Sequence, residues 1–290
     1  MILSASRRTD IPSYYSEWFM NRLKEGYVLT RNPMNYHQIR RIELNPVNIE
    51  CIVLWSKDPL NMMKYLPEID GMGYKYYFQF TLTPYGREIE RYIRDKEELV
   101  DTFQKLSGMI GKDRVVWRYD PVILNDQLTV QYHAEQFERL CRQLQGYTGT
   151  CNISFCDIYK KLSKEAKEHV IWPISGQQMD QVAEILVAIA GNYNIELRAC
   201  CEKKDLANAG IGPAACIDRE LIEKICGHPV QAKADKSQRE GCSCIQSTDL
   251  GVYNTCRHGC IYCYASHSDK SIKQNCLRHN PQAPILIGEE

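Results

Sequence analysis

Six short runs rich in β-branched and aromatic residues, separated by longer helical patterns, constrain the fold of this chain more than any other feature. The runs are Met1–Ser6, Cys51–Ser56, Lys75–Leu82, Arg114–Tyr119, Cys151–Cys156 and Ile195–Cys200. Strands of this length that alternate with helices are typical of βα units and of a parallel sheet. The order therefore predicts an α/β protein, either a partial barrel or an open sheet covered by helices.

The intervals between these runs carry helical patterns. The patterns begin at Ser13, Arg87, Thr129 and Ser175. The first is expected to end at Gly26, because glycine is favoured just after a helix. Ser175 with Gln178 has the spacing of a capping box. Residues 27–45 contain two further β-like runs and are expected to form a hairpin insertion.

Charge and hydropathy narrow the class of protein. The chain has 36 basic and 36 acidic residues among 290, so its net charge is zero, which argues against a nucleic-acid partner held by its phosphates. No apolar stretch is long enough to span a bilayer, and the start MILSASRRTD lacks the pattern of a signal peptide. We therefore expect a cytoplasmic protein without a membrane partner.

Fourteen cysteines in a reducing compartment indicate metal ligation more than disulfides. Cys51, Cys141 and Cys151 lie in apolar or helical patterns and are expected to be small buried hydrophobic residues. The other cysteines concentrate towards the C-terminus. There, beyond Cys201, one short helix is expected from Asp218, followed by a polar stretch with little periodicity.

A stretch of this kind is uncommon in a compact domain unless something else orders it, and bound metal can supply the free energy of folding. We expect two parts, a strand–helix domain at residues 1–202 and a cysteine-rich segment at residues 203–290.

Polar side chains follow the ends of all six predicted strands. They are Arg7, Arg8, Thr9 and Asp10; Lys57 and Asp58; Thr83 and Tyr85; Arg118, Tyr119 and Asp120; Asp157; and Cys200, Cys201 and Glu202. Sites of parallel α/β folds gather at the carboxyl ends of the strands. These residues are therefore expected to line one pocket, with Arg118, Tyr119 and Asp120 as catalytic candidates. Arg118 and Asp120 fit a structural ion pair equally well.

Three cysteines, Cys256, Cys260 and Cys263, lie within eight residues near the end of the chain. Structural zinc normally takes four closed ligands, so a zinc site here would need Cys242, Cys244 or His258 as well. An iron–sulfur cubane held by three thiolates keeps one iron open for an exogenous ligand. His258 is expected to shield the site more than to ligate.

The pattern C-x-x-x-C-x-aromatic-C resembles the signature of radical S-adenosylmethionine (radical SAM) enzymes. The resemblance implies a six-stranded (β/α)6 partial TIM-type barrel and a [4Fe–4S] cluster on Cys256, Cys260 and Cys263. It also implies that the amine and carboxylate of S-adenosylmethionine chelate the fourth iron. One electron then cleaves a carbon–sulfur bond, giving methionine and a 5′-deoxyadenosyl radical. Tyr262 is implied to pack near the adenine.

The same resemblance implies partners, namely an electron donor such as flavodoxin or ferredoxin and a small-molecule or peptide substrate. The chain departs from the pattern in two ways. The triplet follows the strand series instead of the first strand, and no Gly-Gly-Glu segment is present. The chain also resembles an uncharacterised group of proteins that begin with SxRTDIP and end with this cysteine loop, so we expect the tail to fold back over the pocket.

Charge complementarity assigns candidate ligands for S-adenosylmethionine. Arg7 or Arg8 suits its carboxylate, and Asp157 or Glu202 suits its amine or ribose. A second set of thiols comprises Cys200, Cys216, Cys242 and Cys244. This set would complete an auxiliary cluster, hold a structural zinc, or stay unligated. The alternative for the whole protein is a non-catalytic module that binds zinc or iron–sulfur and serves as an interaction surface.

Overall fold

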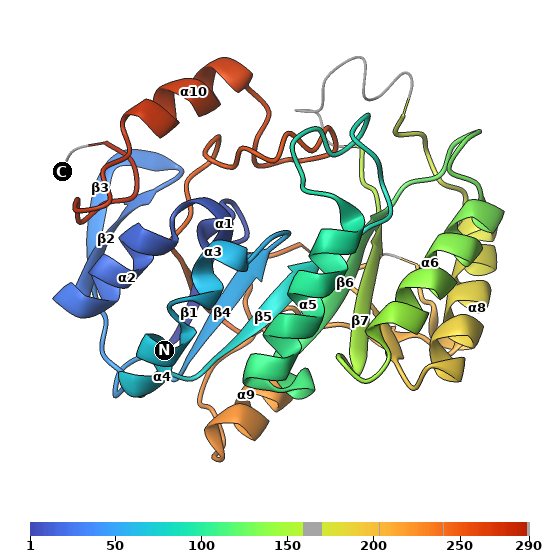
Figure 1. The fold of residues 1–290 in the computed structure, drawn as a ribbon, viewed down its shortest axis with the longest axis horizontal. Helices are drawn as coiled ribbons and strands as arrows, with labels where there is room; N and C mark the ends of the chain where they lie inside the picture. Colours follow the sequence, from blue (N-terminus) through green and yellow to red (C-terminus); the bar gives the residue numbers. More distant parts are fainter. Residues whose placement is uncertain (159–169, 203, 240, 289–290) are drawn as a thin grey trace.

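The computed structural model of the chain describes residues 1–158, 170–202, 204–239 and 241–288. Within them, one parallel sheet has eight strands in the order β10-β1-β4-β5-β6-β7-β8-β9 (Figure 1). The strands are β1 (Ile2–Ala5), β4 (Cys51–Ser56), β5 (Tyr76–Thr81), β6 (Val115–Val122), β7 (Thr150–Phe155), β8 (Glu196–Ala199), β9 (Gly212–Pro213) and β10 (Thr248–Asp249). The α/β class and all six predicted strands are confirmed.

Helices pack along this sheet and bury its side chains. The longer ones are α2 (Ser16–Glu25), α5 (Lys96–Ile110), α6 (Val130–Leu144) and α8 (Gly176–Asn192). Figure 1 shows α5 in front of strands β5 and β6, with α6 and α8 beside β7. Trp117 of β6 stacks on Phe137 of α6 at a ring distance of 5.0 Å, so aromatic packing joins helix to sheet. No helix in the described ranges is both long and apolar enough to cross a membrane.

Local signals in the sequence predicted several element ends correctly. Gly26 takes a left-handed conformation after α2, and Ser175 forms the predicted capping box at the start of α8. Asp218 caps α9 (Arg219–Cys226) through its side chain.

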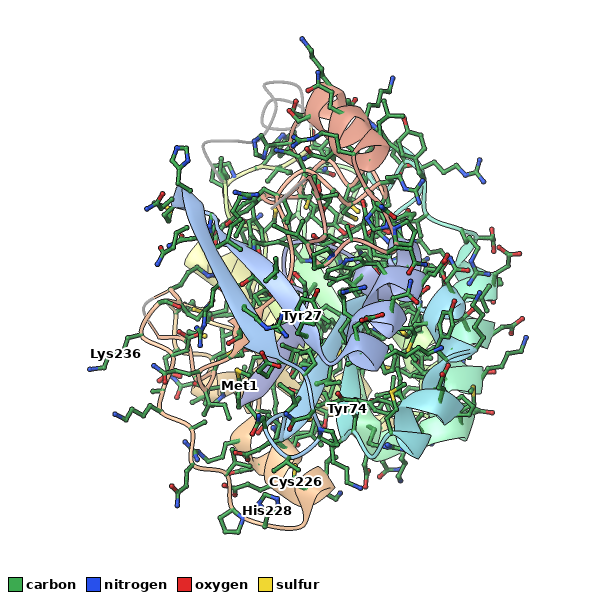
Figure 2. The ribbon with its side chains drawn as sticks, turned by 90° about the vertical axis from the view of Figure 1, so that its left-hand side faces the viewer. Met1, Tyr27, Tyr74, Cys226, His228 and Lys236 are labelled. Atoms are coloured by element: carbon green, nitrogen blue, oxygen red, sulfur yellow. The ribbon has the colours of Figure 1, made fainter. Side chains whose placement is uncertain are left out.

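The predicted hairpin is the antiparallel pair β2 (Tyr27–Asn32) and β3 (Asn35–Glu43), and Figure 2 shows Tyr27 at its start. The remaining elements are α1 (Ile11–Tyr14), α3 (Leu60–Met63), α4 (Leu66–Gly71), η1 (Lys112–Arg114), η2 (Ala207–Ala209) and α10 (Asp269–Leu277).

One predicted helix begins later than its sequence pattern suggests. The periodic pattern starts at Arg87, but α5 begins at Lys96 with Asp95 as its N-cap. Ile89 and Ile93 in the preceding segment are buried in the interior of the protein. The carboxylate of Glu90 is also buried and pairs with Lys57. Tertiary contacts therefore take this segment out of the helix despite its apolar spacing.

The C-terminal segment is part of the sheet. Both edge strands come from it, and β10 lies parallel to β1 with Leu3 opposite Thr248 and Ser4 opposite Asp249. Further along, the Trp18 indole N–H donates to the Ala283 carbonyl at 2.9 Å. The tail thus pairs with the N-terminal strand and contacts α2.

A buried histidine of α6 makes stability depend on pH. The His133 ring is fully buried, and its nitrogens contact the Tyr119 hydroxyl at 2.7 Å and the Ile123 carbonyl at 2.8 Å. Burial lowers the pKa of His133 to about 4 from 6.5. Between pH 6.5 and pH 4, His133 is therefore protonated in the unfolded chain but remains neutral in the folded chain. The free energy of unfolding should fall by about 3 kcal/mol between pH 6.5 and pH 4 from this residue.

Urea unfolding at pH 7 and pH 4 measures this difference. Because other groups titrate in the same window, the decisive comparison is between the native chain and His133→Gln, in which the pH-dependent loss should be smaller by about 3 kcal/mol. His228→Gln, at an exposed position, is the matched control and should leave the pH dependence unchanged. Equal pH dependence in the native chain and His133→Gln would contradict the prediction.

Candidate functional site

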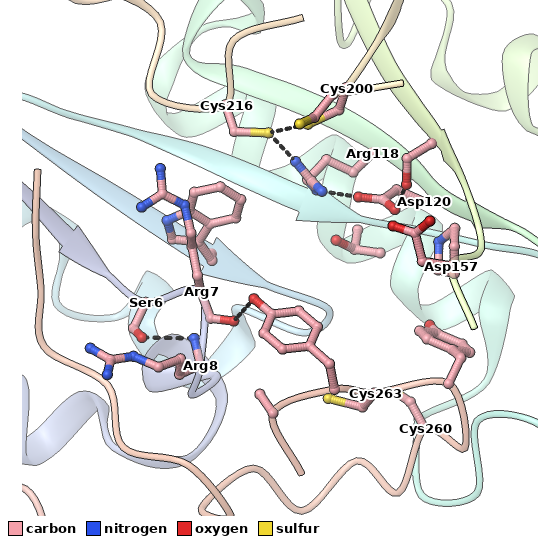
Figure 3. A pocket seen from close by; sticks show the side chains of 18 of the residues that line it. Ser6, Arg7, Arg8, Arg118, Asp120, Asp157, Cys200, Cys216, Cys260 and Cys263 are labelled. Atoms are coloured by element: carbon pink, nitrogen blue, oxygen red, sulfur yellow. Dashed lines mark hydrogen bonds and ion pairs between the residues drawn. The ribbon is translucent and has the colours of Figure 1, made fainter. Parts of the chain in front are cut away.

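A cavity of about 460 Å³ lies at the carboxyl ends of the parallel strands. Its lining brings together two groups that are far apart in sequence (Figure 3). The strand ends contribute Arg7, Arg8, Asp10, Trp55, Lys57, Arg118, Asp120, Ser154 and Asp157. The cysteine-rich segment contributes Cys216, Cys242, Cys244, Cys256, Cys260, Cys263 and Tyr262. Residues of the tail and residues at the strand ends therefore line one cavity.

The three thiols of the triplet line one side of this cavity. The Cys263 N–H donates to the Cys260 carbonyl at 3.1 Å, which makes a tight turn between the last two. Gly259 has a φ of +68°, and a Cβ there would lie 2.7 Å from the Tyr92 ring. The positive φ therefore favours glycine at this position, and any larger residue would also have to displace the exposed Tyr92 ring. Burial raises the pKa of Cys260 to about 12 and also raises the pKa of Cys256 and Cys263.

Asp10 connects the triplet loop to the strand ends. One of its carboxylate oxygens accepts from His258 Nε2 at 2.7 Å and from the Lys57 N–H at 2.8 Å. The other accepts from the Ser56 hydroxyl at 2.7 Å. His258 Nδ1 contacts the Tyr14 hydroxyl at 2.8 Å, so both ring nitrogens have partners. His258 therefore positions the loop between Cys256 and Cys260.

Glu90 makes a second connection. Its buried carboxylate accepts hydrogen bonds from Lys57 at 2.7 Å and from Thr83 at 2.8 Å, and also from Lys96 and the Tyr262 hydroxyl. Burial opposes ionisation, but the two ammonium groups outweigh it and lower the pKa of Glu90 to about 2. The carboxylate is thus charged at neutral pH and holds Tyr262, the aromatic residue of the cysteine motif.

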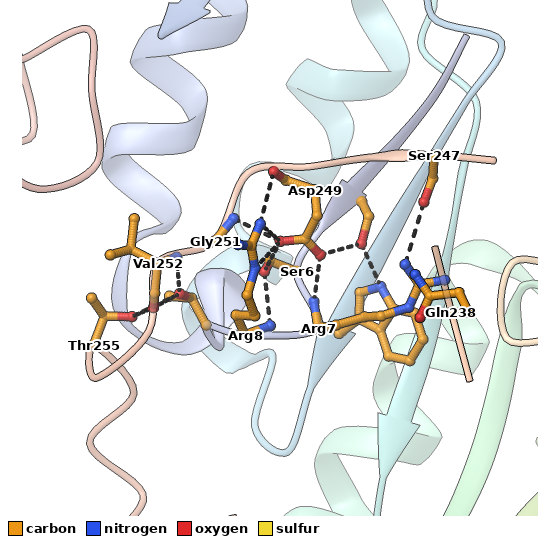
Figure 4. A network of polar contacts seen from close by, with 12 residues as sticks. Ser6, Arg7, Arg8, Gln238, Ser247, Asp249, Gly251, Val252 and Thr255 are labelled. Atoms are coloured by element: carbon orange, nitrogen blue, oxygen red, sulfur yellow. Dashed lines mark hydrogen bonds and ion pairs between the residues drawn. The ribbon is translucent and has the colours of Figure 1, made fainter. Parts of the chain in front are cut away.

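Asp249 makes the third connection, at the edge of the sheet (Figure 4). It accepts from the Ser6 hydroxyl at 2.7 Å and the Arg7 N–H at 2.9 Å, and it forms an ion pair with Arg8 at 3.0 Å. A Cβ at Gly251 would collide with the Ser6 hydroxyl. The chain that leads into the triplet loop is therefore packed against the residues that follow β1.

The predicted ligands of S-adenosylmethionine have different surroundings. Arg8 is engaged by Asp249, whereas Arg7 lies over the Trp55 ring at 5.2 Å and its buried Nη2 has no hydrogen-bond partner. Asp157 lines the cavity and pairs with Arg239. Glu202 is not among the lining residues, because its carboxylate accepts from the Phe155 N–H at 2.8 Å at the end of β7.

The three catalytic candidates of β6 separate according to the alternation of side chains along a strand. Arg118 and Asp120 face the cavity and form an ion pair. Tyr119 between them points to the opposite face, where it is fully buried against α6 and contacts His133. This placement corrects the expectation that Tyr119 belongs to the site.

Figure 3 shows Cys200 and Cys216 of the second set of thiols across the cavity from Cys260 and Cys263 of the triplet. The Cys200 and Cys216 sulfurs are 3.2 Å apart, and the Arg118 Nη1 donates to the Cys216 sulfur at 2.7 Å. Cys242 and Cys244 line the same cavity. The hydrogen bond from Cys216 lowers the pKa of Cys200 to about 7. The described residues contain no group of three or more His, Cys, Asp or Glu side chains already placed around a single metal ion.

Sequence reasoning missed two of the three connections. Glu90 lay within the pattern read as helix, so its burial had no sequence signal. Asp249 lies in a segment without periodicity, and only its pairing with β1 reveals its role. Asp10 was predicted from its position after the first strand, although its contact with His258 was not.

The comparison with known protein families bears on this whole arrangement. A family model described as a domain of unknown function, DUF1848, matches residues 2–265. The chain belongs to the DUF1848 family. The DUF1848 match spans the six central strands, both sets of cavity thiols and all three connections. No curated protein and no solved structure matches the chain.

Proposed function

We propose that this DUF1848 protein is a radical SAM enzyme whose catalytic [4Fe–4S] cluster is held by Cys256, Cys260 and Cys263. The observation that carries the proposal is that these thiols line the same cavity as the carboxyl ends of the parallel strands. Their spacing resembles the radical SAM signature. Three thiolates leave one iron open, as binding of a small-molecule ligand requires.

The surrounding residues fit such a cluster. The thiols come from one turn that Asp10, Glu90 and Asp249 tie to the strand ends, so the ligands are held before metal binds. Ligands held in this way need less ordering on binding. When bound, the cluster would supply the electron that cleaves the sulfonium into methionine and a 5′-deoxyadenosyl radical.

The protein's own groups would bind and orient S-adenosylmethionine. The partnerless Nη2 of Arg7 is a hydrogen-bond donor for its carboxylate. Tyr262 is held by Glu90 at the cavity and presents an aromatic ring to the adenine. Asp157 at the cavity is the remaining candidate for the amine or ribose. Arg118 and Asp120 lie where a substrate would meet the cofactor.

The proposal extends to the finer fold and to the partners. The sheet has β10 and β9 at its two ends, and this open order agrees with a (β/α)6 partial barrel completed by two short edge strands. The cavity volume lies in the range of small-ligand sites, which favours a small molecule or the side chain of a peptide as substrate. A flavodoxin or ferredoxin in the cytoplasm would supply the electron.

Anaerobic reconstitution tests the enzymatic activity. The protein is loaded with iron and sulfide, reduced with dithionite and incubated with S-adenosylmethionine. We expect 5′-deoxyadenosine and methionine in equal amounts by liquid chromatography. A protein with its full complement of iron that yields neither product would overturn the proposal. A colourless protein with stoichiometric zinc at the triplet would favour the non-catalytic module instead.

A further inference from the structure

We propose that Cys200, Cys216, Cys242 and Cys244 form a second, independent thiolate-ligated metal centre on the opposite side of the cavity. We call these four residues the thiol group. Iron–sulfur clusters and zinc both take four thiolates, and either would complete the site. The inference does not depend on cleavage of S-adenosylmethionine.

The first support is the convergence of three chain segments. Cys200 follows β8, Cys216 follows β9, and Cys242 and Cys244 belong to a loop in the tail. The Cys200 and Cys216 sulfurs are 3.2 Å apart. Two thiolates on one tetrahedral zinc lie roughly 3.8 Å apart, so only a small separation of these two sulfurs is needed to admit a metal. Four thiols from three chain segments thus line one cavity.

The second support is the rigidity of the two buried thiols of the group, Cys216 and Cys244, which we call the inner thiols. The Cys216 carbonyl accepts from the Tyr77 hydroxyl at 2.7 Å and the Gln79 amide at 2.9 Å, and both donors belong to β5. The Ile217 N–H donates to the Cys244 sulfur at 3.3 Å. Backbone donors to sulfur are a common feature of metal–thiolate sites, where they stabilise the negative charge.

The third support is charge. The Arg118 guanidinium donates to the Cys216 sulfur at 2.7 Å, and the half-buried Arg7 lines the same cavity. The two guanidinium groups flank Trp55 at 5.1 and 5.2 Å from its ring. Arg118 is also paired with Asp120, so part of its charge is already balanced. Four thiolates around a metal carry a net negative charge, which these arginines offset.

The two half-buried thiols, Cys200 and Cys242, which we call the outer thiols, must move before all four sulfurs can bind one metal centre. Cys200 and Cys242 are half-buried, whereas Cys216 and Cys244 are buried. Because a cysteine side chain has one torsion about Cα–Cβ, Cys200 can turn away from Cys216 and Cys242 can turn as well, which makes room for a metal between the four sulfurs.

The test measures the metal content of a variant that lacks the three cysteines of the triplet. In the triple variant Cys256→Ser, Cys260→Ser, Cys263→Ser, purified anaerobically, we expect one centre per chain by elemental analysis. About four irons with sulfide identify a cluster, and about one zinc identifies a zinc site. Adding Cys216→Ser should lower this content at least tenfold. Adding Cys226→Ser instead, on α9 outside the cavity, should leave it unchanged.

A folded triple variant without metal would overturn the inference. A mass decrease of about 2 Da, marking a Cys200–Cys216 disulfide in the anaerobic protein, would overturn it as well. If the triple variant does not fold, the inference is tested instead by the rate at which iodoacetamide alkylates the cysteines of the metal-loaded native protein. Cys200 and Cys242 should then resist iodoacetamide at least tenfold more than the equally half-buried Cys226, and equal rates would overturn the inference.

Discussion

Cys260→Ala is expected to remove the catalytic cluster and with it all cleavage of S-adenosylmethionine. Cys260 is the middle ligand of three, and the two that remain cannot hold a cubane. Iron content should fall by about four per chain, and the broad visible absorption of that cluster should disappear. Formation of 5′-deoxyadenosine should drop to the background of the assay.

Cys276→Ala is the matched control for this prediction. Its sulfur lies behind the triplet loop, 3.9 Å from the Thr255 carbonyl, and it does not line the cavity. Iron content and product formation should match those of the native protein. An unchanged iron content in Cys260→Ala would show that the ligand is assigned incorrectly, whatever the activity.

Glu90→Gln is expected to give the largest loss of stability. The carboxylate is 1% exposed and balances Lys57 and Lys96, which are 13% and 19% exposed. A neutral amide leaves both buried ammonium groups without a counter-charge. Breaking one side of a buried ion pair costs roughly 3–5 kcal/mol in the free energy of unfolding. Urea unfolding of the anaerobic protein at pH 7 measures this loss.

Glu43→Gln provides the comparison for the Glu90 result. Glu43 pairs with Arg41 at 2.7 Å, but both side chains are more than half exposed. An exposed pair contributes at most about 1 kcal/mol, because water screens it. Equal losses in the two variants would mean that the Glu90 carboxylate is not the buried charge on which the triplet loop depends.

Local chemistry explains which parts of the fold were predictable. The six central strands were readable because their apolar runs are short and continuous, as burial on both faces of a parallel sheet requires. Gly26, Ser175 and Asp218 marked helix ends because capping depends on neighbouring residues only. The helix expected from Arg87 failed for the opposite reason, since the buried contacts of Glu90 come from residues distant in sequence.

The candidate site divides in the same way. The sequence by itself determined the α/β class and the identity of the thiols, because spacing and residue type carry that information. Only the tertiary structure decided that both sets of thiols share one cavity and that Asp249 joins the tail to β1. Those outcomes depend on contacts across more than 200 residues, such as Ser6 with Asp249, and no local pattern encodes them.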